Sequence, residues 1–140
     1  MSKIQVVYWS QTGNTQAMAE AVARGIEAAG KEAELVEVGA ASLDDLKNAS
    51  AFAMGCPAMG DEVLEDTEFE PMFDGCKDAL KGKNIALFGS YGWGDGEWMR
   101  NWEDSCKEAG ANLVCESVIC QEEPDDEATE ACKALGAALV

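Results

Sequence analysis

The chain has 140 residues, the usual size of one compact domain, and its hydrophobic fraction of 47% is ordinary for a globular protein. Its formal net charge of -17 argues against partners with a phosphate backbone or an anionic membrane surface, and it favours a basic protein partner. The sequence has no apolar run long enough to span a bilayer and no signal-peptide pattern at its N-terminus, so we expect a cytoplasmic protein.

Short β-like runs alternate with helical patterns along the chain. We expect strands over 3–9, 32–38, 50–56, 83–90 and 111–120. We expect helices from the first loop to Gly30, in a short stretch capped by Ser42, over 67–76 and 97–110, and from Pro124 onward. Such alternation predicts one α/β domain over 1–140, with a parallel sheet that has helices on both faces. The third and fourth runs carry the fewest charges and suit central strands buried on both faces.

The cysteines do not follow a metal-binding pattern. The chain has six, and no two of them have the C-x-x-C spacing of a zinc or iron–sulfur site. It has no histidine that could complete such a site. In a cytoplasmic protein we therefore expect free, buried thiols and no metal.

The loop after the first expected strand reads "SQTGNT" and leads directly into a helix. In open α/β sheets, ligands bind beyond the carboxyl ends of the strands, which places this loop at the expected site. Backbone N–H groups at a helix N-terminus bind a phosphate without a cation, and Ser10, Thr12, Asn14 and Thr15 can add side-chain donors around Gly13. The alternative is an ordinary turn capped by a threonine or an asparagine.

The loops after the third and fourth strands each contain a large side chain between glycines or next to one. Met59 stands in "AMGDE" and Trp93 in "YGWGDG", and two such groups can enclose a planar ring. Tyr91 could line the same site or only cover it. Trp98 and Trp102 are expected to be packing residues on the next helix, and Trp9 is expected in the core.

The three segments "SQTGNT", "AMGDEVLE" and "FGSYGWGDGEWM" resemble, in order and spacing, the loops that bind flavin mononucleotide (FMN) in the short-chain flavodoxins. The resemblance implies a flavodoxin-like three-layer sandwich over 1–140, with a five-stranded parallel sheet of order 2-1-3-4-5. It implies that the chain is a low-potential one-electron carrier rather than an enzyme. Such a protein holds FMN non-covalently, shuttles between semiquinone and hydroquinone, and donates electrons to redox partner proteins.

The resemblance also implies a role for each residue of the three loops. The phosphate would be held by Ser10, Gln11, Thr12, Gly13, Asn14 and Thr15. Met59 and Trp93 would lie against the two faces of the ring. Backbone groups would contact the ring or the ribityl chain from Ala58, Gly60, Asp61, Glu62, Ser90, Tyr91, Gly92 and Gly94. No catalytic or metal-binding residue is implied.

Gly60 takes the second position of the expected turn 59–62, where a type II′ turn requires a positive φ. We expect this freedom to let the following peptide turn its carbonyl towards the flavin N5 and stabilise the semiquinone.

Two acidic clusters follow the third and fifth expected strands, with six acids between Asp61 and Glu70 and six between Glu122 and Glu130. Both would lie on the rim of the flavin site, so we expect basic reductases and electron acceptors to dock there. Acids also favour helix starts, which accounts for part of this clustering. Negative surroundings without a nearby cation disfavour an anionic hydroquinone, which predicts a low potential. We expect a monomer.

Other proteins of similar topology fit less well. A receiver domain needs acids after the first strand and a lysine after the fifth, and the sequence has Trp9-Ser10 and Cys120-Gln121 there. A phosphatase needs a cysteine and an arginine in the first loop. An FMN-dependent quinone reductase remains the alternative, although it must seat a nicotinamide and a substrate over the ring, where Trp93 is expected to stand.

Overall fold

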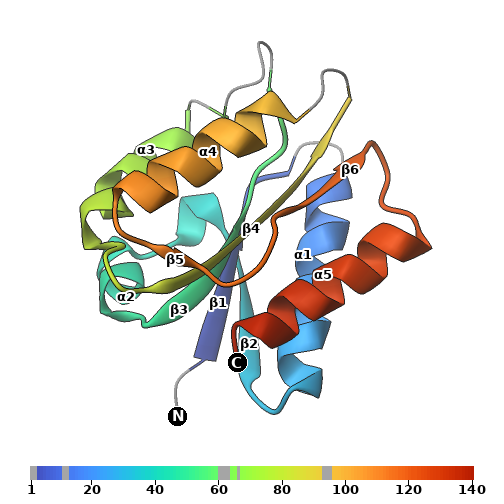
Figure 1. The fold of residues 1–140 in the computed structure, drawn as a ribbon, viewed down its shortest axis with the longest axis horizontal. Helices are drawn as coiled ribbons and strands as arrows, with labels where there is room; N and C mark the ends of the chain where they lie inside the picture. Colours follow the sequence, from blue (N-terminus) through green and yellow to red (C-terminus); the bar gives the residue numbers. More distant parts are fainter. Residues whose placement is uncertain (1–2, 11–12, 60–63, 66, 93–95) are drawn as a thin grey trace.

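The computed structural model describes residues 3–10, 13–59, 64–65, 67–92 and 96–140. The strands are β1 (Lys3–Tyr8), β2 (Glu32–Glu37), β3 (Ala51–Gly55), β4 (Asn84–Tyr91), β5 (Asn112–Leu113) and β6 (Val118–Gln121). The helices are α1 (Asn14–Ala28), α2 (Leu43–Asn48), α3 (Phe69–Cys76), α4 (Glu97–Glu108) and α5 (Asp126–Ala138), with short 3₁₀ turns at Val38–Ala40 and Lys77–Ala79 (Figure 1).

The strands form one parallel sheet in the order β2-β1-β3-β4, and both β5 and β6 pair with β4 on its far side. This confirms the predicted order 2-1-3-4-5. The strand expected over 111–120 is interrupted, because the chain turns aside at Cys115–Ser117 and Ser117 Oγ donates to Glu103 Oε2 of α4 at 2.7 Å. β3 and β4 are buried along almost their full lengths, as expected for central strands.

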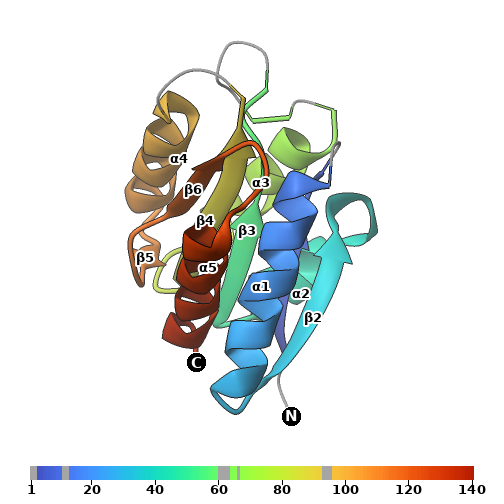
Figure 2. The same ribbon diagram turned by 90° about the vertical axis from the view of Figure 1, so that its right-hand side faces the viewer.

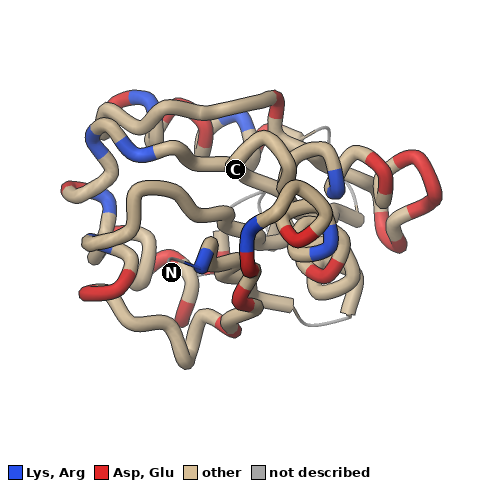
Figure 3. The backbone as a smooth tube through the Cα atoms, turned by 90° about the horizontal axis from the view of Figure 1, so that it is seen from below, with Lys and Arg blue, Asp and Glu red and all other residues tan. Residues whose placement is uncertain are grey.

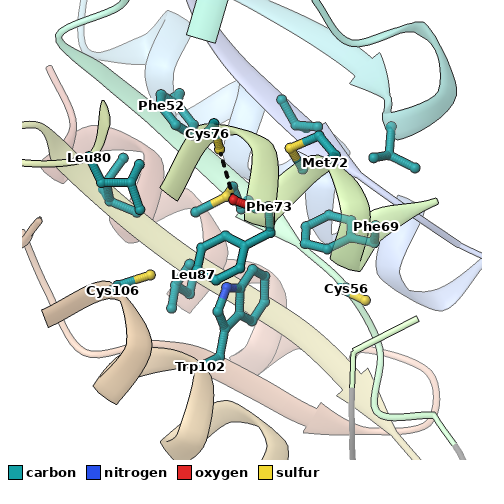
Figure 4. Packing of buried hydrophobic residues seen from close by; sticks show 14 of the residues in the cluster. Phe52, Cys56, Phe69, Met72, Phe73, Cys76, Leu80, Leu87, Trp102 and Cys106 are labelled. Atoms are coloured by element: carbon teal, nitrogen blue, oxygen red, sulfur yellow. Dashed lines mark hydrogen bonds between the residues drawn. The ribbon is translucent and has the colours of Figure 1, made fainter. Parts of the chain in front are cut away.

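Helices cover both faces of the sheet, which makes the predicted three layers (Figure 2). α1 and α5 pack on one face around a cluster that includes Val6, Ile26, Phe88 and Leu135. α2, α3 and α4 cover the other face. Their cluster is shown in Figure 4, and it includes Phe52, Phe69, Phe73, Trp98 and Trp102.

Aromatic packing between α3 and α4 anchors these helices to each other. Phe69 and Phe73 both meet the Trp102 ring edge-on, with centroids 5.3 and 6.1 Å away. Trp98 and Trp102 are both 2% exposed, which confirms that they are packing residues. Trp9 is only half-buried, so the expectation that it lies in the core is met in part.

Capping explains where two helices begin. Ser42 Oγ accepts the backbone N–H of Asp45 at the start of α2, as predicted. α5 begins at Asp126 rather than at Pro124, because the Asp125 carboxylate accepts the backbone N–H of Ala128 at 2.8 Å. Within the described residues, no helix has the length and the apolar character that crossing a bilayer would need.

Candidate functional site

A cavity of about 460 Å³ lies beyond the carboxyl ends of β1, β3, β4 and β6, a size that is usual for a small-molecule site. This edge of the sheet is at the top of Figure 1. The cavity is lined by Ser10, Asn14, Thr15, Pro57, Ala58, Met59, Ser90, Tyr91, Gly92, Glu122 and Glu123. The structure therefore brings together predicted residues from all three loops, as expected for the edge where parallel strands end.

Ser10 and Gly13, the described residues on either side of positions 11 and 12, are joined at the start of α1. Gly13 has a φ of 93°, in the left-handed region that favours glycine, and its N–H donates to Ser10 Oγ at 3.1 Å. Ser10 Oγ also accepts the N–H of Gln16 at 3.3 Å, so this serine organises the helix start and can still donate its own hydroxyl hydrogen. The first turn of α1 has no acidic residue. Its helix dipole is thus directed at the cavity edge without a competing side-chain anion.

Two buried hydroxyls connect the first loop to β4. Thr15 is 1% and Ser90 is 5% exposed, and their hydroxyl oxygens lie 3.2 Å apart. The Ser90 backbone N–H also donates to Thr15 Oγ1, at 3.4 Å. Each hydroxyl is therefore a hydrogen-bond partner for the other in buried surroundings. This pair fixes the start of α1 relative to the end of β4.

The second loop is attached to β4 at its start. Cys56 N–H donates to Phe88 O at 3.2 Å, and Ala58 N–H donates to Ser90 O at 3.0 Å. From the other side, the Trp98 indole N–H donates to Cys56 O at 3.1 Å. These contacts place Ala58 and Met59 on the cavity wall.

The loop after β6 closes the cavity, and the candidate residues from the sequence did not include it. Glu122 has a φ of 58°, and its N–H donates to Tyr91 O at 2.7 Å. The Gln121 side chain donates to Gly92 O at 3.3 Å. Glu122, Glu123 and Pro57 line the cavity in addition to the predicted residues. The sequence had placed Glu122 and Glu123 on the rim of the site as part of an acidic docking cluster, and the structure puts both on the cavity wall itself.

Several predicted site residues lie outside the described residues: Gln11, Thr12, Gly60, Asp61, Glu62, Trp93 and Gly94. The enclosure of a ring by Met59 and Trp93, and the turn at 59–62, therefore stay predictions.

The site has a negative electrostatic character. Of the described residues that line the cavity, Glu122 and Glu123 are acidic and none is Lys or Arg. Cys56, directly beneath the second loop, is fully buried, and burial raises the pKa of its thiol to about 12. The thiol therefore stays protonated at neutral pH. All six cysteines are free; Cys115 and Cys120 are half-buried and the other four are buried, so the expectation of free thiols is confirmed.

The arrangement suits a phosphorylated molecule with a planar, partly apolar body. The hydroxyl-rich start of α1 can hold an anionic end group through dipoles, and Ala58, Met59 and Tyr91 offer apolar surface beside it. These features fit FMN.

Comparison with known proteins identifies the family. The flavodoxin family model matches residues 6–136. A flavodoxin from Clostridium beijerinckii is 47% identical over 133 residues, which cover 95% of this chain and 96% of that protein. A flavodoxin from Megasphaera elsdenii is 44% identical over 96% of each chain, and the solution structure of two-electron reduced Megasphaera elsdenii flavodoxin superposes with a TM-score of 0.89 over 97% of each chain, at 45% identity. The chain therefore belongs to the flavodoxin family and is a small FMN-binding protein that transfers electrons to redox partners.

Proposed function

We propose that this chain, folded as one FMN-binding domain over 1–140, carries single electrons at low potential with FMN held in the cavity beyond β1, β3 and β4. One observation carries the proposal: the start of α1, the loop after β3 and the end of β4 border the same cavity of about 460 Å³. When bound, FMN supplies a ring that accepts and releases electrons one at a time.

The proposed binding residues are those of the three loops. Ser10, Gly13, Asn14 and Thr15, together with Gln11 and Thr12, hold the phosphate at the start of α1. Ala58, Met59, Ser90, Tyr91 and Gly92 contact the ring or the ribityl chain, and so do Gly60, Asp61, Glu62, Trp93 and Gly94. This assignment is supported by the shared cavity and by the Thr15–Ser90 pair that joins two of the loops.

The low potential follows from the charges around the ring. A ring that gains electrons gains negative charge, and Glu122 and Glu123 at the cavity wall oppose that charge. A neutral phosphate loop provides no cation to offset them. Apolar neighbours such as Met59 also exclude water that would solvate the charge.

The partner proposal is a basic redox protein that docks at the acidic rim. Figure 3 shows an almost continuous acidic stretch where the chain passes from β6 to α5. A second cavity of about 660 Å³ lies between β6 and α5 and shares Tyr91 and Glu123 with the first. Four of its lining residues are acidic: Glu116, Glu123, Asp125 and Glu127. A positively charged partner would be steered to this side of the molecule, close to the flavin.

The remaining parts of the proposal concern the setting in which the protein works. We propose a monomer in the cytoplasm that binds neither nucleic acid nor membrane. The formal charge of -17 supports this, because it repels phosphate-rich surfaces. The free thiols support a reducing compartment.

An anaerobic reductive titration of the protein loaded with FMN tests the proposal. We expect the long-wavelength absorbance of one-electron-reduced flavin to rise and then fall as reductant is added. Direct passage to the two-electron-reduced flavin would contradict one-electron transfer. Rapid oxidation of a nicotinamide nucleotide by a quinone, without a separate reductase, would instead support the enzyme alternative.

A further inference from the structure

We propose that Glu65 is a positioning residue for the flavin site: with the Cys56 thiol, its carboxylate fixes the base of the segment 57–64, which carries Ala58 and Met59 to the cavity. The inference rests on the proposed cofactor site and adds a residue that does not line it.

Glu65 is the only charged side chain that is buried in the part of the chain that the structure describes, with 4% of its surface exposed. Its Oε1 accepts the backbone N–H groups of Glu68 and Phe69, both at 2.8 Å. Its Oε2 accepts the backbone N–H of Thr67 at 2.8 Å and also the Thr67 hydroxyl. Both carboxylate oxygens are therefore saturated by donors at the start of α3.

The backbone of Glu65 ties the same residue to the end of β3. Its N–H donates to Cys56 Sγ at 3.4 Å, and the Cys56 thiol donates in turn to Pro57 O at 3.5 Å. Cys56 is itself held by Phe88 and by the Trp98 indole. Cys56 and Glu65, which flank the segment and are nine positions apart in sequence, are thus joined at its base.

A simple helix cap does not account for this arrangement. The N-cap residue of α3 is Glu68, whose side chain makes no cap hydrogen bond, and Glu65 lies three positions further back. A neutral Ser or Thr at the N-cap can accept a helix N–H, whereas a buried carboxylate is costly unless hydrogen bonds satisfy it, as the four donors of Thr67, Glu68 and Phe69 do here. Glu65 connects α3 to the loop that borders the cofactor, and this connection is what the buried charge maintains.

The electrostatics of Glu65 agree with a permanent anion. Burial on its own raises the pKa of the carboxyl, but the hydrogen bonds from Thr67, Phe69 and Glu68 together outweigh burial and hold the pKa below its usual value. The carboxyl is therefore ionised at neutral pH, as an acceptor for all its donors.

Without the carboxylate, the Glu65–Cys56 contact beneath Ala58 and Met59 keeps its backbone hydrogen bond but loses its connection to Thr67, Glu68 and Phe69 at the start of α3. Ala58 and Met59 are then held less firmly at the cavity wall, so fixing them when a flavin binds costs more conformational entropy and the affinity falls. The phosphate loop is untouched, because it is held by Ser10 and by the Thr15–Ser90 pair. The loss of affinity should therefore come from contacts with the ring, and it should be equal for flavins with and without the phosphate.

The test compares the dissociation constants of FMN and of riboflavin, which lacks the phosphate, measured by quenching of flavin fluorescence. Glu65→Gln keeps the size of the side chain but places an amide N–H₂ among N–H donors. We expect it to bind both ligands about tenfold more weakly, equivalent to about 1.4 kcal/mol, with the ratio of the two constants unchanged. Ser10→Ala, in contrast, should weaken FMN and leave riboflavin unaffected.

Asp74→Asn is the matched control, because it removes one negative charge from an exposed position of the same helix α3 and should bind both ligands like the parent protein. If Glu65→Gln does not fold, Thr67→Val removes a single hydroxyl donor, and we expect it to bind both ligands about threefold more weakly. The proposal is overturned if the folded variant at position 65 or 67 binds both ligands like the parent, or loses only FMN. If the parent protein binds neither ligand, the proposed cofactor site itself has failed.

Discussion

Replacing Gly25 by alanine should destabilise this protein, although alanine is the better helix former. α1 and α5 lie side by side on one face of the sheet (Figure 2), and the two backbones approach closely at Gly25 of α1. A Cβ atom at Gly25 would lie 2.0 Å from the carbonyl oxygen of Lys133. Gly136 of α5 makes the reciprocal contact, since a Cβ there would lie 2.1 Å from Val22 O.

Two opposing effects determine how much Gly25→Ala changes the free energy of unfolding. In an isolated helix, alanine is favoured over glycine by about 1 kcal/mol. In this protein, the new Cβ atom would lie 2.0 Å from Lys133 O, and real Cβ atoms essentially never come within 3.0 Å of another atom. The carbonyl oxygen belongs to the backbone of α5 and cannot rotate away as a side chain could, so the helices would have to move apart. Overpacking of this kind costs about 3 kcal/mol, and displacement of a whole helix is at the upper end of that range. The net expectation is a loss of about 2 kcal/mol, or roughly 8 °C in melting temperature for a chain of this size.

Urea unfolding of the FMN-free protein, followed by far-ultraviolet circular dichroism, measures the change. Gly75→Ala in α3 is the control, because its Cβ would meet only the flexible Leu43 side chain, at 3.0 Å. That variant should be as stable as the parent or slightly more stable. If Gly25→Ala were as stable as Gly75→Ala, α1 and α5 would not pack as closely as described.

Two further predictions concern pH. Burial, the largest cause in each case, raises the pKa of the Cys56, Cys106 and Cys132 thiols to about 12 and that of Cys76 and Cys120 to about 11. At pH 8 a thiol-exchange reagent should therefore label the native protein far more slowly than the urea-unfolded protein, in which all six cysteines react. Rapid labelling of any of the four buried cysteines, Cys56, Cys76, Cys106 or Cys132, in the native protein would contradict this burial. The lowered pKa of Glu65 gives the folded state stability that is fully present above the unfolded value of about 4.3 and is lost as the pH falls through the lower folded value. The parent should thus be more stable than Glu65→Gln at pH 7 by a margin that narrows at pH 3, and a margin equal at both pH values would contradict an ionised, hydrogen-bonded Glu65.

The fold could be predicted because its signals are local. Apolar runs of strand length, bounded by Gly30, Ser42 and the acids near Asp125, determine where each element begins and ends. The break between β5 and β6 could not be predicted, because "ANLVCESVIC" has a continuous β-like pattern. It is a tertiary contact, from Ser117 to Glu103 on α4, that accompanies the departure of the chain from the sheet edge.

The candidate site was predictable to the extent that its residues follow strand ends. Ser10, Thr15, Met59 and Ser90 come together because parallel strands end at one edge, which a sequence pattern can indicate. The role of Glu65 was not predictable in this way. In the sequence it is one of six acids between Asp61 and Glu70, and only the fold shows that its carboxylate is buried among backbone donors while Glu68 and Glu70 are exposed.

The placement of charge connects the three parts of the proposed function. A lysine in the first loop would hold a phosphate more strongly than hydroxyls and a helix start, but its positive charge would also stabilise reduced flavin and raise the potential. A neutral loop binds the phosphate through dipoles that act at short range, so the acids around the cavity still oppose an added electron. The same acids, concentrated between β6 and α5 beside the cavity, attract a basic partner to the edge from which that electron would leave. Low potential and partner docking therefore both depend on the absence of cations near the cavity. A single lysine placed at the cavity wall should raise the potential of the flavin and reduce the attraction of a basic partner.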